Sequence, residues 1–241
     1  MVTAPRTVNG LSICSAGGYW VDVIKKDGTM AGWGADQYGQ IGDGTSGAGN
    51  NKPSPVTVTL PKGTVSSVVA GGNNTYAMMA DGSLYAVGDN TYAELGNGAS
   101  GGIQTAWGLV GISGINGVYT GQKFALATKP GGTLWDWGYN VDGELGDGTS
   151  GAGNYQLSPK KISGIKNVAS VSGGNNHTLA LKHNGNVWAW GLNANGQLGQ
   201  GGSAPGANSL VPERVPGLSN VSQVAAGFYS SIALEKGADR D

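Results

Sequence analysis

Glycine recurs along this chain at an almost constant interval, and this constrains the fold more than any other feature of the sequence. Successive leading glycines are separated by 54, 50, 53 and 53 residues. A period of this length indicates an array of one supersecondary unit, in which each unit buries its apolar face against its neighbours. These five glycines are Gly17, Gly71, Gly121, Gly174 and Gly227.

A second set of glycines keeps a fixed offset from the first. In four repeats a glycine follows 17 residues after the leading one, at Gly34, Gly88, Gly138 and Gly191. Glycine is the default residue where the backbone must turn tightly or approach another segment closely. Glycine accounts for 46 of the 241 residues, but the fixed offsets exclude low complexity. We therefore predict that these nine glycines are structural.

The fourth repeat shows which unit is repeated. Residues 167–172, 178–182 and 186–191 form short apolar runs, and Asn184-Gly185 separates the last two. Such a pair between alternating runs predicts a hairpin with a tight primed turn, and Asp27-Gly28 and Asp81-Gly82 repeat it. A fourth strand follows at 159–162 and 212–215. Four strands and no helical period predict the blade of a β-propeller.

A second motif follows the third predicted strand of each repeat, in which one apolar residue stands among glycines. We predict that this residue anchors a long loop while the glycines let the backbone reverse. The four anchors are Ile41, Leu95, Leu145 and Leu198.

These motifs resemble the regulator of chromosome condensation repeat family. The resemblance is carried by residues 173–181 with Gly-Gly-x-x-His-Thr-Leu-Ala-Leu, by Trp-Ala-Trp-Gly at 188–191, and by Asn-Gly-Gln-Leu-Gly at 195–199. It extends over nearly the whole chain, in four full copies and a partial fifth. It implies a propeller, which in that family usually has seven blades.

The chain is predicted to be one propeller domain, residues 1–241. Its repeats are expected at about 12–65, 66–116, 117–166, 167–219 and 220–241, the last one partial, with 1–11 as the last strand of a preceding repeat. Seven blades would need about 360 residues at this period. Three arrangements stay open: a five-bladed ring, an open arc, or an arc completed by another chain. Because an open arc exposes apolar blade faces, we expect closure or assembly.

Composition excludes several kinds of partner. The net charge is −1 with scattered lysines and arginines, so no basic face for nucleic acid is expected. No apolar run approaches the roughly 18 residues of a membrane-spanning helix. The low charged fraction of 12% favours an extracellular or virion surface. Cys14 stands alone in an apolar stretch and is predicted to be a small buried hydrophobe.

A binding face is predicted at the segment between the first two strands of each repeat. The residues two and three positions after the leading glycine change from repeat to repeat, and variable chemistry at a fixed place is how repeat proteins build binding faces. Neutral loop variation is the alternative. The candidate rim residues are Tyr19, Trp20, Lys123, Phe124, Asn176, His177, Phe228 and Tyr229.

Tryptophan is expected to play two roles in this chain. Trp33, Trp137 and Trp190 recur at one position of the repeat, where Val87 stands in the second, and this recurrence predicts packing between blades. Trp20 and Trp107 fall outside that position and are expected to make surface contacts.

The sequence offers little for catalysis or metal binding. His177 matches a structural His-Thr pair of the family, and His183 stands in a hairpin turn without an obvious partner. Asp43, Thr45 and Asn50, repeated at Asp147, Thr149 and Asn154, could supply oxygen ligands for calcium, but each loop has only one carboxylate. We therefore expect no enzyme activity, no metal and no cofactor.

Three functions are weighed. The leading hypothesis is a non-enzymatic protein–protein interaction scaffold, with a protein partner or self-assembly, in an extracellular or virion setting. The alternative is a carbohydrate-binding, lectin-like propeller that uses rim aromatics to stack on sugars. Guanine nucleotide exchange, which the resemblance also implies, is the least supported, because it requires a complete seven-bladed surface and a protruding wedge hairpin.

Overall fold

The computed structural model describes residues 11–61, 63–204 and 206–237, and in these ranges it contains strands and no helix. The first blade comprises β1 (Leu11–Ala16), β2 (Trp20–Lys25), β3 (Met30–Gly34) and β4 (Lys52–Val58). The second comprises β5 (Val65–Gly71), β6 (Asn74–Met79), β7 (Ser83–Asp89) and β8 (Ile103–Ser113). The third comprises β9 (Gly117–Thr120), β10 (Phe124–Lys129), β11 (Thr133–Tyr139) and β12 (Tyr155–Lys161). The fourth comprises β13 (Val168–Gly173), β14 (His177–Lys182), β15 (Val187–Gly191) and β16 (Ser209–Arg214). The fifth has two strands, β17 (Val221–Ala226) and β18 (Ser231–Glu235).

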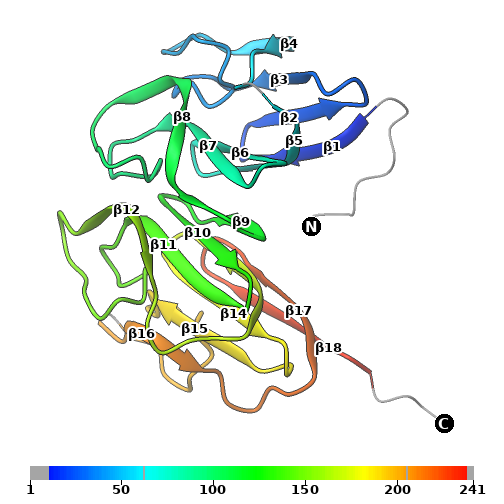
Figure 1. Ribbon diagram of the computed structural model, residues 1–241. Helices are drawn as coiled ribbons and strands as arrows, with labels where there is room; N and C mark the ends of the chain where they lie inside the picture. The colour runs from blue at the N-terminus through cyan, green and yellow to red at the C-terminus, as the bar shows by residue number, and fades with distance from the viewer. Residues whose placement is uncertain (1–10, 62, 205, 238–241) are drawn as a thin grey trace.

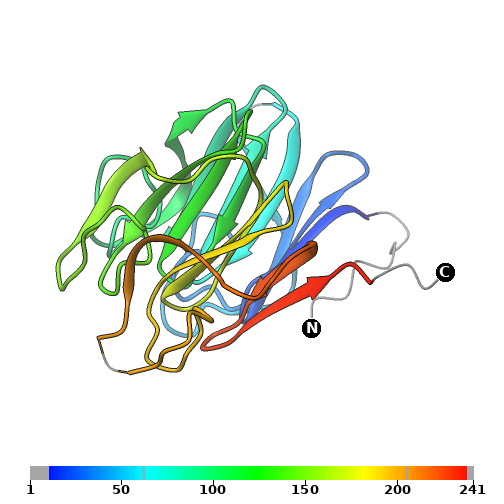
Figure 2. The same cartoon turned by 90° about the horizontal axis from the view of Figure 1, so that it is seen from below.

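The blades are antiparallel sheets whose strands pair in chain order. The first strands of the blades, β1, β5, β9, β13 and β17, contact one another in series and so surround the axis of the fan. Figure 1 shows this radial arrangement, and the view from below in Figure 2 shows β17 and β18 paired at the end of the molecule. The predicted all-β propeller, with four complete blades and a partial fifth, is confirmed.

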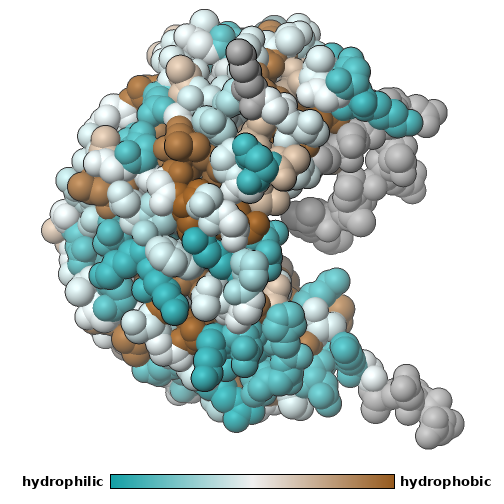
Figure 3. Space-filling view, in the orientation of Figure 1, coloured by the Kyte–Doolittle hydropathy of each residue, from teal (hydrophilic) through white to brown (hydrophobic). Residues whose placement is uncertain are grey.

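The described residues form the open arc and not the compact five-bladed ring. The first blade and the two-stranded fifth stand at the two ends, and Figure 3 shows the opening between them. The predicted last strand of a preceding repeat, residues 1–11, lies outside the described residues except for Leu11, which begins β1. None of the described segments is a helix long and apolar enough to cross a membrane.

The prediction that Cys14 is buried is wrong, because its side chain is exposed. Cys14 lies on β1, the innermost strand of the first blade. In the interior of the arc a first strand packs against blades on both sides, but β1 belongs to the end blade and has a described neighbour on one side alone. Local apolar sequence therefore does not bury it.

The hairpins between the second and third strands are confirmed, but their turn type differs from the prediction. In the first blade, Gly28 N–H donates to the Lys25 carbonyl at 2.9 Å and Lys25 N–H donates to the Thr29 carbonyl at 2.8 Å. Gly28 alone takes positive φ, at 82°. This is a three-residue loop closed by a left-handed glycine. The Asp27 carboxylate accepts Thr29 N–H at 2.9 Å and stabilises this longer form.

The long loops are held by an anchor and by a buried side-chain oxygen, of which the sequence predicted only the anchor. The four predicted anchors are at most 1% exposed. The residue two positions after the second glycine of each repeat, such as Gly191, is buried, and its side-chain oxygen accepts the backbone N–H of the anchor. In the fourth blade Asn193 Oδ1 accepts the Leu198 N–H at 3.0 Å. The same contact recurs in each complete blade, and its recurrence at a fixed offset could have revealed it. The accepting residues are Asp36, Asn90, Asn140 and Asn193.

An indole packs on the glycine that follows the anchor, and this contact joins neighbouring blades. A Cβ added at Gly96 would lie 2.7 Å from Cδ1 of Trp137 in the next blade, and one at Gly146 would lie 2.7 Å from Nε1 of Trp190. Both indoles are fully buried. The predicted packing of Trp137 and Trp190 between blades is therefore confirmed, whereas Trp33, on the end blade, is only half-buried.

Candidate functional site

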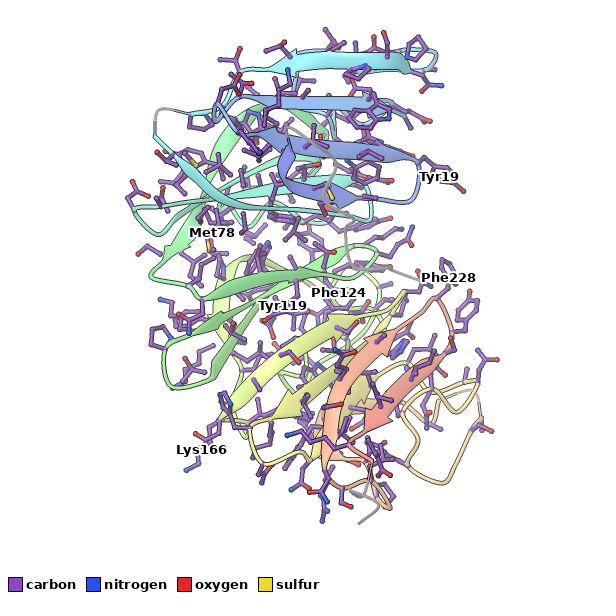
Figure 4. All side chains as sticks on the ribbon, turned by 90° about the vertical axis from the view of Figure 1, so that its right-hand side faces the viewer. Tyr19, Met78, Tyr119, Phe124, Lys166 and Phe228 are labelled. Atoms are coloured by element: carbon purple, nitrogen blue, oxygen red, sulfur yellow. The ribbon has the colours of Figure 1, made fainter. Side chains whose placement is uncertain are left out.

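The turns between the first and second strands of the blades meet at one rim of the arc, around its axis. They line a cavity of about 290 Å³ whose wall is formed largely by backbone, because most of its residues are glycine or alanine. Gly18, beside Tyr19, and Phe228 line it from the two ends of the arc. The side chains labelled in Figure 4 show Tyr19 and Phe228 at this edge and Lys166 at the opposite one.

Three of the candidate rim residues are buried, and for Trp20 this contradicts the expected surface contact. Trp20 and Phe124 are 2% exposed and His177 is 0% exposed. Each folds back over the leading glycine of its own repeat, where an added Cβ would overlap the ring. The leading glycine has no side chain and leaves a space open beside it. The residue three positions later varies between repeats because different side chains can fill that space.

Trp20 and Trp107, expected at the surface, serve the contact between the first two blades instead. Trp20 Nε1 donates to Asp22 Oδ2 at 3.0 Å and to Thr75 Oγ1 at 3.1 Å. The half-buried Trp107 lies over Gly42, where an added Cβ would be 2.8 Å from its Nε1. The second blade has Val87 where other blades have tryptophan, and Trp107 on β8 supplies the missing indole.

His177 connects the fourth blade to the fifth and is not poised for acid–base chemistry. Its Nε2 lies 3.0 Å from Ser231 Oγ, which donates its own proton to the Gln197 carbonyl at 2.7 Å. Ser231 Oγ must therefore accept from Nε2–H, which assigns the neutral Nε2 tautomer. Burial lowers the pKa of His177 to about 4. The ring stays neutral at physiological pH and holds two blades together.

The exposed part of the rim is aromatic. Tyr19 is 85% exposed, Phe228 55% and Tyr229 51%. The rings of Phe228 and Tyr229 meet edge to face, with centroids 4.6 Å apart. Tyr19 comes from the first blade and the other two from the fifth, so they flank the axial cavity from both ends of the arc. We call these three residues the rim aromatics.

Lys123 and Asn176 lie between the ends of the arc and are engaged locally. The Lys123 ammonium stands 4.6 Å from the ring centroid of Tyr92 and 5.5 Å from that of Tyr139. Asn176 Nδ2 donates to Asp142 Oδ2 at 2.6 Å, across the boundary between the third and fourth blades. Both side chains are half-buried, and a role for them in binding stays a prediction.

Two buried glutamates occupy the position just before the anchor, where other repeats have glutamine. Glu94 and Glu144 are 1% exposed, and burial raises the pKa of Glu94 to about 7 and that of Glu144 to about 8. Gln40 and Gln197 fill the same place, and in all four loops the side-chain oxygen accepts a backbone N–H two residues earlier. A protonated carboxyl reproduces the neutral glutamine, so these glutamates are structural.

The carboxylates considered for calcium are paired with lysine. Lys52 Nζ lies 2.9 Å from Asp43 Oδ2, and Lys160 Nζ lies 3.1 Å from Asp147 Oδ2. An ammonium group at this distance already neutralises the carboxylate. His183 is exposed in its hairpin turn, where its backbone N–H donates to the Asn167 carbonyl. Within the described ranges no cluster of three metal-ligating side chains occurs.

Two sequence models of one repeat family match this chain. The sequence model of the regulator of chromosome condensation (RCC1) repeat matches residues 27–78, 131–181 and 184–234. A second model of the same repeat matches residues 65–94 and 168–197. The chain belongs to the RCC1 repeat family. These matches cover more than half of the chain, and the resemblance stated from its motifs is confirmed.

Among curated RCC1-repeat relatives, the human E3 ubiquitin-protein ligase HERC2 is 30% identical over 222 residues, which are 90% of this chain and 4% of HERC2. The ultraviolet-B receptor UVR8 of Arabidopsis thaliana is 32% identical over 227 residues, which are 93% of this chain and 39% of UVR8. The RCC1-repeat chain therefore spans well under half the length of these relatives. The similarity covers only the matched part of each relative, so the functions of their remaining parts do not carry over to this chain.

Among solved structures, Prp20p from Saccharomyces cerevisiae superposes with a TM-score of 0.83 at 20% sequence identity. The match covers 97% of this chain and 58% of that one. Prp20p is described as binding Gsp1p and histones. At this identity the likeness establishes a shared propeller fold, and the binding belongs to Prp20p.

Proposed function

We propose that this RCC1-repeat chain is a non-enzymatic scaffold that binds a protein partner at the rim formed by the turns between first and second strands. The observation that carries the proposal is the exposure of the rim aromatics on both sides of the axial cavity. Exposed tyrosine and phenylalanine supply large contact area with few rotatable bonds, and aromatic residues are enriched at protein interfaces. Glu94 and Glu144, whose pKa values burial raises, accept backbone N–H groups within their own loops, which supports a structural role for these two carboxyl groups.

The test replaces the rim aromatics together, as Tyr19→Ala, Phe228→Ala and Tyr229→Ala. The matched control replaces three apolar residues of similar exposure on outer strands, as Ile103→Ala, Leu109→Ala and Val211→Ala. In quantitative affinity capture from the native source, we expect the rim variant to lose at least about tenfold of the bound partner and the control to retain it. Equal capture by the rim variant and the unmodified protein would refute the proposal. Circular dichroism checks that both variants fold.

Carbohydrate is the second candidate ligand, because exposed tyrosine and phenylalanine rings can also stack on sugars. A glycan array separates the two. Saturable binding to a defined glycan that the rim variant loses would replace the protein partner with a sugar. Nucleotide release from a small GTPase, the activity that the family resemblance implies, is assayed in parallel, and we expect no acceleration.

We further propose an extracellular or virion setting. The support is compositional, since only 12% of the residues are charged. Immunogold labelling of the native source is the measurement, and signal confined to the cell interior would contradict the proposal.

A further inference from the structure

In three of the four anchor loops among the described residues, an indole from the next blade packs on the glycine after the anchor, and the fourth loop lacks this ring. An indole covers the glycine after the anchor at Gly42, Gly96 and Gly146. At Gly199, by contrast, the sole atom within 4 Å of an added Cβ is Cγ1 of Val215 in the same blade. The fourth anchor loop therefore has no indole over it among the residues described.

The space beside Gly199 is an apolar groove of about 240 Å³ between the fourth blade and β18. Leu179, Val187 and Leu198 form part of one wall, and Ser231 and Ala233 part of the other. None of the ten lining residues is ionisable. A neutral and largely apolar group fits such a groove.

The polar atoms at the groove indicate which group is missing. The Glu144 carbonyl accepts two hydrogen bonds from the next blade, one from Thr178 Oγ1 at 3.0 Å and one from Trp190 Nε1 at 2.9 Å. The equivalent Gln197 carbonyl accepts from Ser231 Oγ at 2.7 Å. Ser231 stands where Thr178 does, so the second donor position at this carbonyl is that of an indole N–H.

The backbone of β18 offers the rest of the site. In the fourth blade β14 pairs with β13 on one side and β15 on the other, and Thr178 lies opposite Trp190. Among the residues that the structure describes, β18 pairs with β17 alone in a two-stranded sheet. Its other backbone edge is therefore unpaired among the described residues, and an added strand can pair with it. Ile232 and Leu234, 67% and 56% exposed, show that one face of this hairpin is uncovered as well.

We propose that β18 and the groove beside Gly199 bind an extended segment carrying tryptophan followed by glycine, added antiparallel as a third strand. The indole lies on Gly199 and donates Nε1–H to the Gln197 carbonyl, opposite Ser231. The glycine takes the place that Gly191 has beside His177 in the fourth blade. None of the rim aromatics lines this groove except Phe228 and Tyr229 in no contact with it, so failure of the peptide to bind would leave the rim proposal standing.

The probe is a fluorescein-labelled peptide with the sequence of residues 184–192, which includes β15. Fluorescence anisotropy against the full chain is expected to show saturable 1:1 binding, and hydrogen exchange to show new protection confined to β18. A peptide with alanine at the tryptophan preceding its glycine is expected to bind at least tenfold more weakly. No saturable binding up to about 1 mM would overturn the proposal.

Two protein variants locate the site. Ala233→Trp fills the groove and is expected to weaken peptide binding at least tenfold, while Val211→Trp on the exposed face of β16 leaves it unchanged. Peptide binding that Ala233→Trp does not weaken would overturn the assignment. A dimer of the chain in light scattering that excludes the peptide would overturn it as well, because a second copy would then be the occupant.

Discussion

At the scale of single residues, the repeat position before each anchor shows how burial sets protonation. Two loops have glutamine there and two have glutamate, in one hydrogen-bonded geometry. The buried glutamates fit because burial disfavours their charged form. Of the two glutamates Glu144 has the higher pKa, about 8, and the nearby Asp142 carboxylate adds to the effect of burial.

Glu144→Gln is expected to change the pH dependence of stability. Because the folded-state pKa of about 8 lies above the ordinary value of 4.5, the folded chain binds more protons between those values. The contribution of Glu144 is therefore complete below pH 4.5 and is lost as pH rises to about 8. The variant should be more stable than the parent at pH 8 and equal to it at pH 4.5. Urea denaturation across this range is the measurement.

The exposed Glu213→Gln on β16 is the control and should leave the pH profile unchanged. A parent whose free energy of unfolding does not decline between pH 5 and 8 relative to Glu144→Gln would show that Glu144 is ionised in the folded chain.

At the scale of elements, each of the first three blades is joined to the next by an indole that packs on the glycine of an anchor loop. For Trp137 and Trp190 the contact combines two terms, because the ring is buried against glycine and its Nε1–H donates to a carbonyl of the preceding blade. Trp107 supplies the ring contact alone, because it reaches Gly42 from β8 and its buried Nε1 has no hydrogen-bond partner among the described residues.

Trp190→Phe tests the polar half of this contact. The ring still fills most of the space, but the Glu144 carbonyl loses the donor at 2.9 Å. We expect a loss of about 1–3 kcal/mol in the free energy of unfolding. Trp188→Phe is the matched control on the same strand. The Trp188 indole is half-buried, with its ring centroid 5.0 Å from Lys182 Nζ, and its replacement should lower the free energy of unfolding by less than about 1 kcal/mol. Urea denaturation measures both, and equal losses would contradict this account.

At the scale of the whole molecule, the arc has covered blades in its middle and uncovered faces at its ends. The third blade packs against the second and the fourth, whereas Ile232 and Leu234 of β18 and the thiol of Cys14 face solvent. Leu179 occupies in the fourth blade the repeat position that Ile232 has in the fifth, and it is 3% exposed. The neighbouring blade, and not the local sequence, accounts for that difference.

Native-state hydrogen exchange should follow this gradient. Amides of β10 are expected to exchange by global unfolding, and those of β18 by local opening at much lower free energy. The chain is measured under native conditions with increasing urea, and a blade's amides report its opening. Protection in β18 equal to that in β10 would show that the fifth blade is as stable as the middle of the arc.

Much of the fold follows from local sequence. The glycine period, the hairpins and the four anchors are visible because each depends on residues close together in the chain, where turn geometry and a single buried side chain dominate. The turn type was the exception, since Asp27 and Thr29 stabilise a longer loop than the dipeptide alone predicts.

The sequence by itself determined a fan of four-stranded blades and the places where glycine is required. Only the tertiary structure decided which rim residues face solvent, since Trp20, Phe124 and His177 fold over leading glycines while Tyr19, Phe228 and Tyr229 project. It also decided that the described residues form an arc and that Trp107 replaces a missing indole. The physical reason is that a buried side chain also needs contacts with the next blade, such as Trp20 Nε1 with Thr75 Oγ1 and His177 Nε2 with Ser231 Oγ, and these partners lie about one repeat away in the chain.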